Sequence, residues 1–398
     1  MRPENPFLPA PSPAHPDRAG SSFARPDRSG LTLELVAPET LAPGQQARWA
    51  RLSERSMGAN IFALDWFMGA ALHHCARGRR IRLGVVRQAD GEWLGALPLT
   101  LAATIGRTPV PHWCSWRATN QFLGGPLVAS GGEQAFWRAL LAGLDRRPGA
   151  GIALMGEGLA ADDATTLALV SVAAEEGRRL WIPRRSERPA RFARSEAPQP
   201  SPALRKARSR LASLQRRLER EMGEVRVDLL APGADPEDWI ETFLALEKAG
   251  WKGSCGSALG CEPCNAALFR DTVREGHRRG HARLASLSVG ERVLAMTTWF
   301  ECSGRGFGFK MAHDETARRH APGRLLMRVV AEDLAGDPGI AFDTCNGDGS
   351  APDPLWPDRR QVVDCVVEIG SRGRRGIAAG AMGAAQLWRD LVRRRAAA

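Results

Sequence analysis

Hydrophobic residues in the first half of the chain follow two periods, one typical of strands and one typical of helices. Alternation with period two predicts strands, at 31–36, 81–87, 93–101 and 152–155. Apolar positions that recur every three or four residues predict helices, at 41–57, 65–77, 133–144 and 161–176. The turn Ala89-Asp90-Gly91 joins two of these strands into a hairpin.

The second half shows a similar succession of periods. Strands are predicted at 282–289, 292–300, 306–312, 340–344 and 362–369, and helices at 239–248, 265–279, 323–334 and 377–395. The strand–turn–strand pattern near residue 80 returns near residue 281, and the helix–break–strand pattern of 135–158 returns at 325–347. We infer two copies of one unit of the α/β (α+β) class, each a mixed, mostly antiparallel sheet flanked by helices.

Composition divides the chain into four segments. Residues 1–30 are rich in proline and charge and predict a disordered leader, with no apolar segment of the secretory type. Residues 31–183 would form the first unit and residues 224–398 the second. Between them, proline and arginine in 184–223 predict a linker and then a basic helix, whose leucines share one face; these are Leu204, Leu211, Leu214 and Leu218.

The positive net charge of the chain is only weak evidence for a particular kind of partner. The net charge is +11, from 55 basic and 44 acidic residues, yet only four of the basic residues are lysines and tyrosine is absent, which indicates a compositional bias. A basic surface favours anionic ligands in general. Since no apolar run reaches the ~18–20 residues of a membrane span, we expect a cytoplasmic protein without a membrane span.

The eight cysteines should be free thiols in a cytoplasmic protein. Cys255, Cys261 and Cys264 form the one cluster, with His277 and His281 on the following helix. A single CxxC pair is a weak zinc signal, because structural zinc sites close with four ligands. We therefore expect no metal site and treat these residues as ordinary thiols in a loop.

The start of the helix at 323–334 carries the strongest chemical signal. A strand ends near Ala312, and Pro322-Gly323 then opens an apolar helix, whose first N–H groups lack partners and face an anion favourably. Arg324 lies in its first turn, whereas the corresponding helix of the first unit has Glu133 there, which would compete with a phosphate. The alternative is an ordinary helix start, since Pro-Gly begins many helices.

Three segments together resemble the GNAT acyltransferase superfamily, in particular its CelD-like subgroup, which is associated with cellulose or exopolysaccharide biosynthesis. They are ALEKAGWKG at 245–253, FKMAHDE at 309–315 followed by APGRLL at 321–326, and FDTCNGDGSAPDPLWPDRR at 342–360. The resemblance covers roughly residues 45 to 370. The architecture is also similar to Fem-type aminoacyltransferases, which carry two GNAT-like units. His313 departs from the subgroup pattern, which usually has tyrosine there, and the loop before Gly323 lacks the glycine-rich run of other GNAT members.

The resemblance implies an acyl-CoA, such as acetyl-CoA, bound in the second unit, with a degenerate first unit shaping the acceptor site. The strand at 306–312, with Lys310 and Met311, would pair with the pantetheine arm, and the pyrophosphate would lie at the helix start. The residues implied there are Pro322, Gly323, Arg324 and Leu325. The acceptor would be a small molecule or a saccharide.

Several residues near this strand could move protons, and each has a structural alternative. Glu247 could act as a base through a water molecule, or be a surface carboxylate. His313 has a suitable pKa range, but with Asp314 it could cap the next turn. Asp343 could reach the cleft or hydrogen-bond structurally. Lys310 should alternate with Phe309 and either bind an acidic acceptor or lie solvated at an edge.

Two other functions stay open at this point. A Fem-type ligase would take aminoacyl-tRNA, and the basic helix at 205–220 could then contact RNA, although it lacks interleaved aromatic residues and fits a solvated helix better. Nucleic acid is otherwise not expected as a partner. A decayed GNAT-like binding protein is the third reading. No GxSxG or P-loop motif is present.

Overall fold

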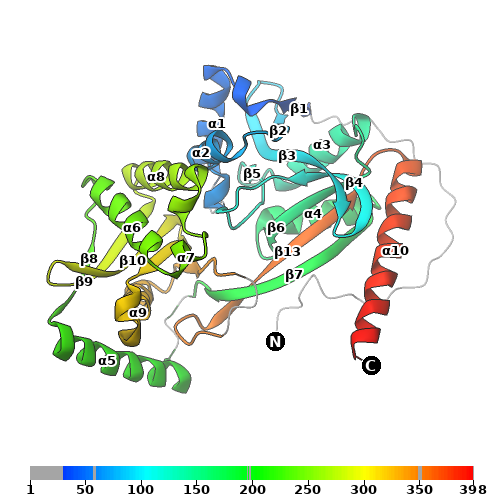
Figure 1. Ribbon diagram of the computed structural model, residues 1–398. Helices are drawn as coiled ribbons and strands as arrows, with labels where there is room; N and C mark the ends of the chain where they lie inside the picture. Colours follow the sequence, from blue (N-terminus) through cyan, green and yellow to red (C-terminus); the bar gives the residue numbers. More distant parts are fainter. Residues whose placement is uncertain (1–29, 57–59, 195, 197–198, 348–351, 398) are drawn as a thin grey trace.

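The computed structural model describes residues 30–56, 60–194, 196, 199–347 and 352–397. The expected leader at 1–30 lies almost wholly outside these residues. The described strands form one sheet of 13 strands (Figure 1). They are β1 (Thr32–Val36), β2 (Ile81–Arg87), β3 (Trp93–Ile105), β4 (Thr108–Ser115), β5 (Leu127–Val128), β6 (Ala153–Ala160), β7 (Leu180–Arg191), β8 (Val225–Leu229), β9 (Ala282–Val289), β10 (Arg292–Cys302), β11 (Arg305–His313), β12 (Ala341–Asp343) and β13 (Asp358–Glu368).

Helices flank this sheet, and the two longest lie at opposite ends of the molecule (Figure 1). The α-helices are α1 (Pro43–Arg55), α2 (Asp65–Cys75), α3 (Glu133–Arg146), α4 (Ala164–Glu175), α5 (Pro202–Met222), α6 (Glu237–Ala249), α7 (Trp251–Ser254), α8 (Pro263–Arg278), α9 (Pro322–Ala335) and α10 (Arg372–Ala397). Four short 3₁₀ helices join them, η1 (Pro38–Thr40), η2 (Ile61–Ala63), η3 (Leu259–Cys261) and η4 (Glu315–His320). Within the described ranges, no helix combines the length and apolar character needed to cross a membrane.

The mixed sheet flanked by helices is the predicted fold class. Its strand order is β1-β2-β3-β4-β6-β13-β7-β12-β11-β10-β9-β8, with β5 paired to β3. Two neighbouring pairs are parallel, β4 with β6 and β11 with β12, and the others are antiparallel. Each half of the chain thus contributes one parallel pair after its hairpins, in agreement with the repeat found in the sequence.

The sequence predicted a linker from residue 184, but this segment begins as part of strand β7. Strand β7 continues to Arg191 despite Pro183 and Pro189, because β13 pairs along its length and β12 pairs at its end. Tertiary pairing here outweighs the local signal of proline. Strand β13, near the C-terminal end of the chain, lies between β6 and β7 and so completes the sheet on the side of the first half.

Two hydrophobic clusters cover the two faces of β11. On one face, aromatic residues of α2, α6 and α8 pack around Phe309, whose ring lies 5.9 Å from that of Phe269 and 4.9 Å from that of Phe300. On the other face, α5 and α9 pack through leucines. This double cover holds β11 rigidly at the centre of the second half, which is where the sequence places its candidate site.

Candidate functional site

Strand β11 has an unpaired edge over its second half. It pairs with β12 through three residues, Arg305 to Phe307, and β12 ends there while β11 continues to His313. Among the described residues, 308 to 313 have no strand partner on that side, although the Met311 carbonyl accepts from Lys252 Nζ at 2.9 Å. An exposed strand edge is a ready template for another extended chain, including the amide groups of a ligand.

The edge is open because β12 turns away toward β7. The Thr344 N–H and hydroxyl both donate to the Pro189 carbonyl, at 3.3 and 2.7 Å. The next residue, Cys345, has φ of +53°, and its N–H donates to Asp343 Oδ1 at 2.9 Å. This short turn, closed by an aspartate side chain, fixes the point of divergence.

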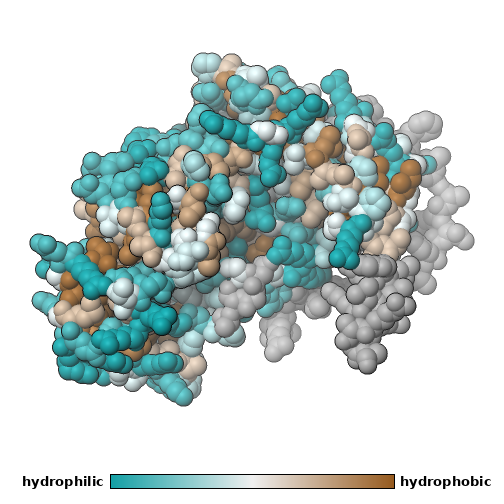
Figure 2. Space-filling model, in the orientation of Figure 1, coloured by the Kyte–Doolittle hydropathy of each residue, from teal (hydrophilic) through white to brown (hydrophobic). Residues whose placement is uncertain are grey.

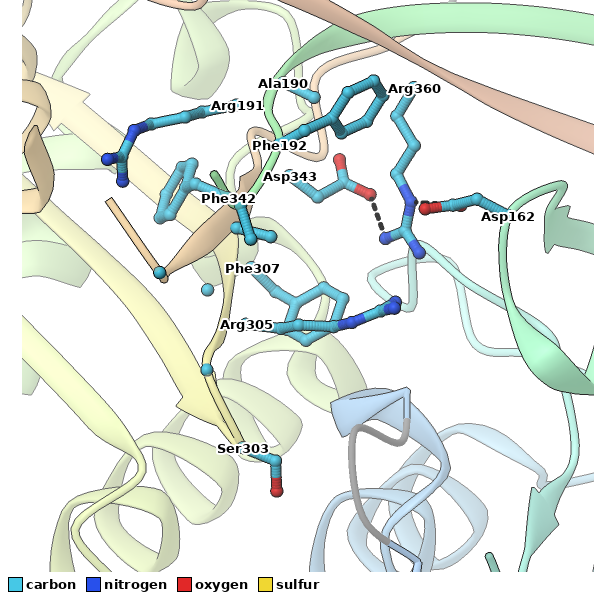
Figure 3. A pocket seen from close by; sticks show the side chains of 15 residues that line it. Asp162, Ala190, Arg191, Phe192, Ser303, Arg305, Phe307, Phe342, Asp343 and Arg360 are labelled. Atoms are coloured by element: carbon cyan, nitrogen blue, oxygen red, sulfur yellow. Dashed lines mark hydrogen bonds and ion pairs between the residues drawn. The ribbon is translucent and has the colours of Figure 1, made fainter. Parts of the chain in front are cut away.

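Asp343 is locked in this turn and has no free oxygen for a substrate. Its side chain is 3% exposed, and Oδ2 accepts from Arg188 at 2.6 Å. The same oxygen accepts from Arg360 at 3.0 Å (Figure 3). Burial alone would raise the pKa of Asp343, but the two guanidinium ions outweigh it and hold the pKa below its usual value. These contacts favour the structural alternative for Asp343, since both of its oxygens are engaged within the protein.

The sequence predicted that the Lys310 and Phe309 side chains would point to opposite sides of the sheet. They do not, because β11 has a bulge at this place. On β10, Thr298 pairs with Lys310 and the next residue, Trp299, pairs with Gly308, so Phe309 has no partner. A bulge turns neighbouring side chains to the same side of a sheet. The Lys310 ammonium consequently lies 5.9 Å from the centre of the Phe309 ring.

The Lys310 ammonium lies in a largely apolar setting between the two halves of the chain. Its Nζ lies 5.4 Å from the centre of the Phe122 ring and donates to Asn120 Oδ1 at 2.6 Å. Burial lowers the pKa of Lys310 to about 8, helped by the positive charge of Lys252 and opposed by Glu247. Lys310 can therefore exchange a proton near neutral pH, which an ordinary lysine does not do.

The sequence left open that Glu247 is a surface carboxylate, but its side chain is buried. Its side chain is 2% exposed; Oε1 accepts from Lys252 Nζ at 2.8 Å and Oε2 from the Leu259 N–H at 2.8 Å. Lys252 Nζ also donates to the Met311 carbonyl at 2.9 Å. With both oxygens engaged, Glu247 connects α6 and α7 to the edge of β11 through Lys252.

His313 and Asp314 end β11 as expected, and Asp314 acts as a cap. Its Oδ1 accepts from the Thr316 N–H at 2.8 Å, and Oδ2 accepts from Arg292 at 2.6 Å. His313 is 30% exposed, and its Nε2 lies 3.2 Å from Glu315 Oε1. His313 is thus the one member of this pair whose side chain stays open to a ligand.

The start of α9 lies directly beside this edge. A Cβ added at Gly323 would lie 3.3 Å from Met311 Sδ and 3.7 Å from His313 Nδ1. The Arg324 and Leu325 N–H groups both donate to the Ala321 carbonyl, at 2.9 and 3.1 Å. Two of the three amides expected to face a phosphate are therefore used by the first bonds of the helix. Within the described residues, the Gly323 N–H makes no such backbone hydrogen bond.

The same Ala-Pro-Gly start recurs at α1, and the comparison shows what is particular to α9. At α1, the Gln45 and Gln46 N–H groups donate to the Ala42 carbonyl at 2.9 and 3.0 Å, and nothing lies within 4 Å of a Cβ added at Gly44. At α3, Glu133 Oε1 accepts from the Gly131 N–H at 3.1 Å, so the expected competition with an anion is present.

The histidines and one cysteine near the CxxC pair make contacts elsewhere in the fold. His277 Nε2 lies 3.1 Å from the Ala234 carbonyl, and His281 Nδ1 lies 2.8 Å from the Glu301 carbonyl. Cys264 lies instead beside Cys75 of α2, whose Sγ is 3.6 Å from the Cys264 carbonyl. Across the ranges that the structure describes, no three side chains of the metal-binding types converge.

Part of the chain resembles a known protein family. Residues 205–350 match the family model described as an acetyltransferase (GNAT) domain. The matched segment, which contains β11, β12 and the start of α9, is thus similar to this family. No functionally curated protein matches the chain by sequence.

The solved structures to which this chain is similar share little sequence with it. A conserved protein of unknown function from Bacteroides thetaiotaomicron is 13% identical, with a TM-score of 0.50 over 81% of this chain and 97% of its own. FemX is 13% identical, with a TM-score of 0.48 over 83% and 96%. A tandem GNAT protein from the clavulanic acid biosynthesis pathway is 16% identical, with a TM-score of 0.41 over 86% and 99%.

Proposed function

We propose that this protein transfers an acyl group, in the first instance acetyl, from a coenzyme A thioester to an amine or hydroxyl acceptor. The observation that carries the proposal is the open edge of β11 beside the start of α9. An extended arm with amide groups can add to the edge as a further strand, and a phosphate can approach the Gly323 N–H. The GNAT domain over residues 205–350 supports the same reading.

The residues of the candidate site would serve two purposes, binding and proton transfer. The edge from Gly308 to His313 would hold the pantetheine arm, and Gly323 with Arg324 would receive the phosphates. The thioester supplies an acyl group already activated for transfer. Lys310, with its pKa lowered to about 8, would take the proton from the attacking amine or hydroxyl and then release it to solvent.

The acceptor would enter on the face of the sheet that the first half covers. Lys310 points to this face, toward Asn120 and Phe122 of the first half. We keep a saccharide or a polysaccharide precursor, as in the CelD-like subgroup, as the proposed acceptor class. The reaction would take place in the cytoplasm, where the eight cysteines would stay reduced.

Acetyl-CoA should stabilise the folded protein. A ligand at 100 times its dissociation constant adds about 2.7 kcal/mol to the free energy of unfolding. Thermal melting with acetyl-CoA, longer acyl-CoAs and adenosine measures this effect, and adenosine serves as the control that lacks the pantetheine arm. An unchanged melting temperature with every acyl-CoA would leave the decayed binding protein as the better description.

A Fem-type ligase that uses aminoacyl-tRNA is the second candidate, and helix α5 favours it. Leu211 and Leu218 are buried against the protein, while a basic arc faces solvent. The arc consists of Arg205, Lys206, Arg210, Arg216, Arg217 and Arg220. Figure 2 shows a predominantly hydrophilic surface at this end of the molecule. If tRNA raises the melting temperature with steep salt dependence and acetyl-CoA does not, this candidate replaces the first.

A further inference from the structure

Asn120 belongs to the first half of the chain but reaches the candidate site of the second half. It lies in the segment that follows β4 and is 7% exposed. The neighbouring Gln121 is fully buried; its Oε1 accepts from the Ala118 N–H at 3.2 Å, and its Nε2 donates to the Leu123 carbonyl at 3.2 Å. Asn60 Nδ2 donates to the same carbonyl at 3.2 Å. The segment is therefore held in place by buried amides.

The Asn120 amide is oriented by groups on both sides. Its Oδ1 accepts from Lys310 Nζ at 2.6 Å, and its Nδ2 donates to Asn265 Oδ1 of α8 at 2.9 Å. An ammonium group can only donate, so the atom that faces Lys310 must be the oxygen. Asn265 completes the arrangement by accepting the amide hydrogen, which keeps the oxygen pointed at Lys310.

A neutral amide at this place has a particular consequence for a lysine. Both the ammonium and the neutral amine form can donate to an amide oxygen, so Asn120 holds Lys310 in either state. A carboxylate in the same place would favour the charged form. Because the amine donates a hydrogen to the amide oxygen, its lone pair points away from Asn120.

The charged groups around Lys310 come from several elements. Lys252 of α7 and Glu247 of α6 act on it with opposite signs. The Phe122 carbonyl, next to the ring that covers Lys310, accepts from Arg188 of β7 at 3.2 Å. Along β11 itself the next titratable group is His313. None of these groups hydrogen-bonds to Lys310 Nζ within the described part of the chain, and the side chain that holds the nitrogen there is Asn120.

We propose that Asn120 is a positioning residue through which the first half of the chain completes the transfer site, holding Lys310 with its nitrogen free to take a proton from the acceptor. The inference rests on the proposed function for its purpose, but the contact itself can be tested without catalysis. It gives the first half, expected from the sequence only to shape the acceptor site, a specific part in proton transfer.

The test is competitive labelling of the lysines with acetic anhydride over a pH series, quantified for each peptide by mass spectrometry. The chain has four lysines, so each is followed separately, and the exposed Lys206 and Lys248 are internal controls. Asn120→Asp should reduce the labelling rate of Lys310 at pH 7.5 at least about tenfold, since a tenfold change corresponds to one pKa unit. The rates at Lys206 and Lys248 should not change.

Asn120→Ala separates positioning from charge and covers the case in which the aspartate variant does not fold. In this variant the labelling rate of Lys310 at low pH should equal that of the wild type. Its kcat should fall, and its KM for acetyl-CoA should stay the same. If the aspartate variant labels Lys310 as fast as the wild type, Asn120 does not hold Lys310. If labelling responds as expected but no acyl-CoA binds, the contact stands and the proposed function fails.

Discussion

Replacing Lys310 with methionine should lower kcat by roughly 10²–10⁴, the usual contribution of a general base. Methionine keeps the length and apolar stem of lysine, so the packing against Phe122 and Phe309 is retained while the basic nitrogen is lost. The measurement is release of the coenzyme A thiol, with the best acceptor from a panel of amines and saccharides. KM for acetyl-CoA should stay close to the wild-type value, because Lys310 faces the acceptor.

If Lys310 is the base, the activity of the wild type should rise with pH. A base works in its neutral form, so kcat/KM should rise with pH through about 8, the pKa of Lys310, and level off above it. At pH 7.5 roughly a quarter of such lysines are neutral. Lys206→Met, on the exposed face of α5, is the matched control and should leave the rate unchanged. A Lys310→Met rate within threefold of the wild type would remove Lys310 from the chemistry.

Replacing Asp343 with asparagine should reduce the free energy of unfolding by about 3–5 kcal/mol, the range for breaking a buried ion pair. Two guanidinium ions converge on one buried oxygen, and Arg188 has no other carboxylate partner among the described residues. Asparagine keeps the shape but leaves that charge uncompensated. The loss also loosens the turn that directs β12 away from β11, so acyl-CoA affinity should fall together with stability. Chemical denaturation measures the first effect and calorimetry the second.

The control for this substitution is an ion pair at the surface. Glu241 lies 2.5 Å from Arg270, and its side chain is 56% exposed. Solvent screens such pairs, so Glu241→Gln should cost less than about 1 kcal/mol. Equal losses for the two substitutions would show that the Asp343 network contributes no more than a surface pair, and the account of the open edge would lose its support.

The sequence predicted most individual elements because their signals are local. The hairpin β9–β10 follows from alternating residues around Gly290, and the start of α9 follows from Pro322-Gly323. What the sequence did not show was decided by distant pairing. Strand β7 contains prolines and charged residues and reads as a linker, and only its partners β12 and β13 make it a strand.

The candidate site divides in the same way. Lys310, Met311 and Gly323 were found because a strand and a helix start stand next to each other in the sequence. Asn120, Arg188 and the burial of Glu247 were missed, because each depends on contacts between segments far apart in the chain. Local patterns carry no information on which distant side chain will neutralise a buried charge.

Calorimetric titration of acetyl-CoA into Gly323→Leu and Gly44→Leu tests the central claim most directly. Both glycines follow Ala-Pro at a helix start, but only Gly323 adjoins the open edge of β11. A leucine at 323 should block the approach of a phosphate to the amide and weaken binding at least about tenfold, or 1.4 kcal/mol. Gly44→Leu should bind as the wild type does. Equal binding by both variants, or none by the wild type, would contradict an acyl-CoA site at this corner.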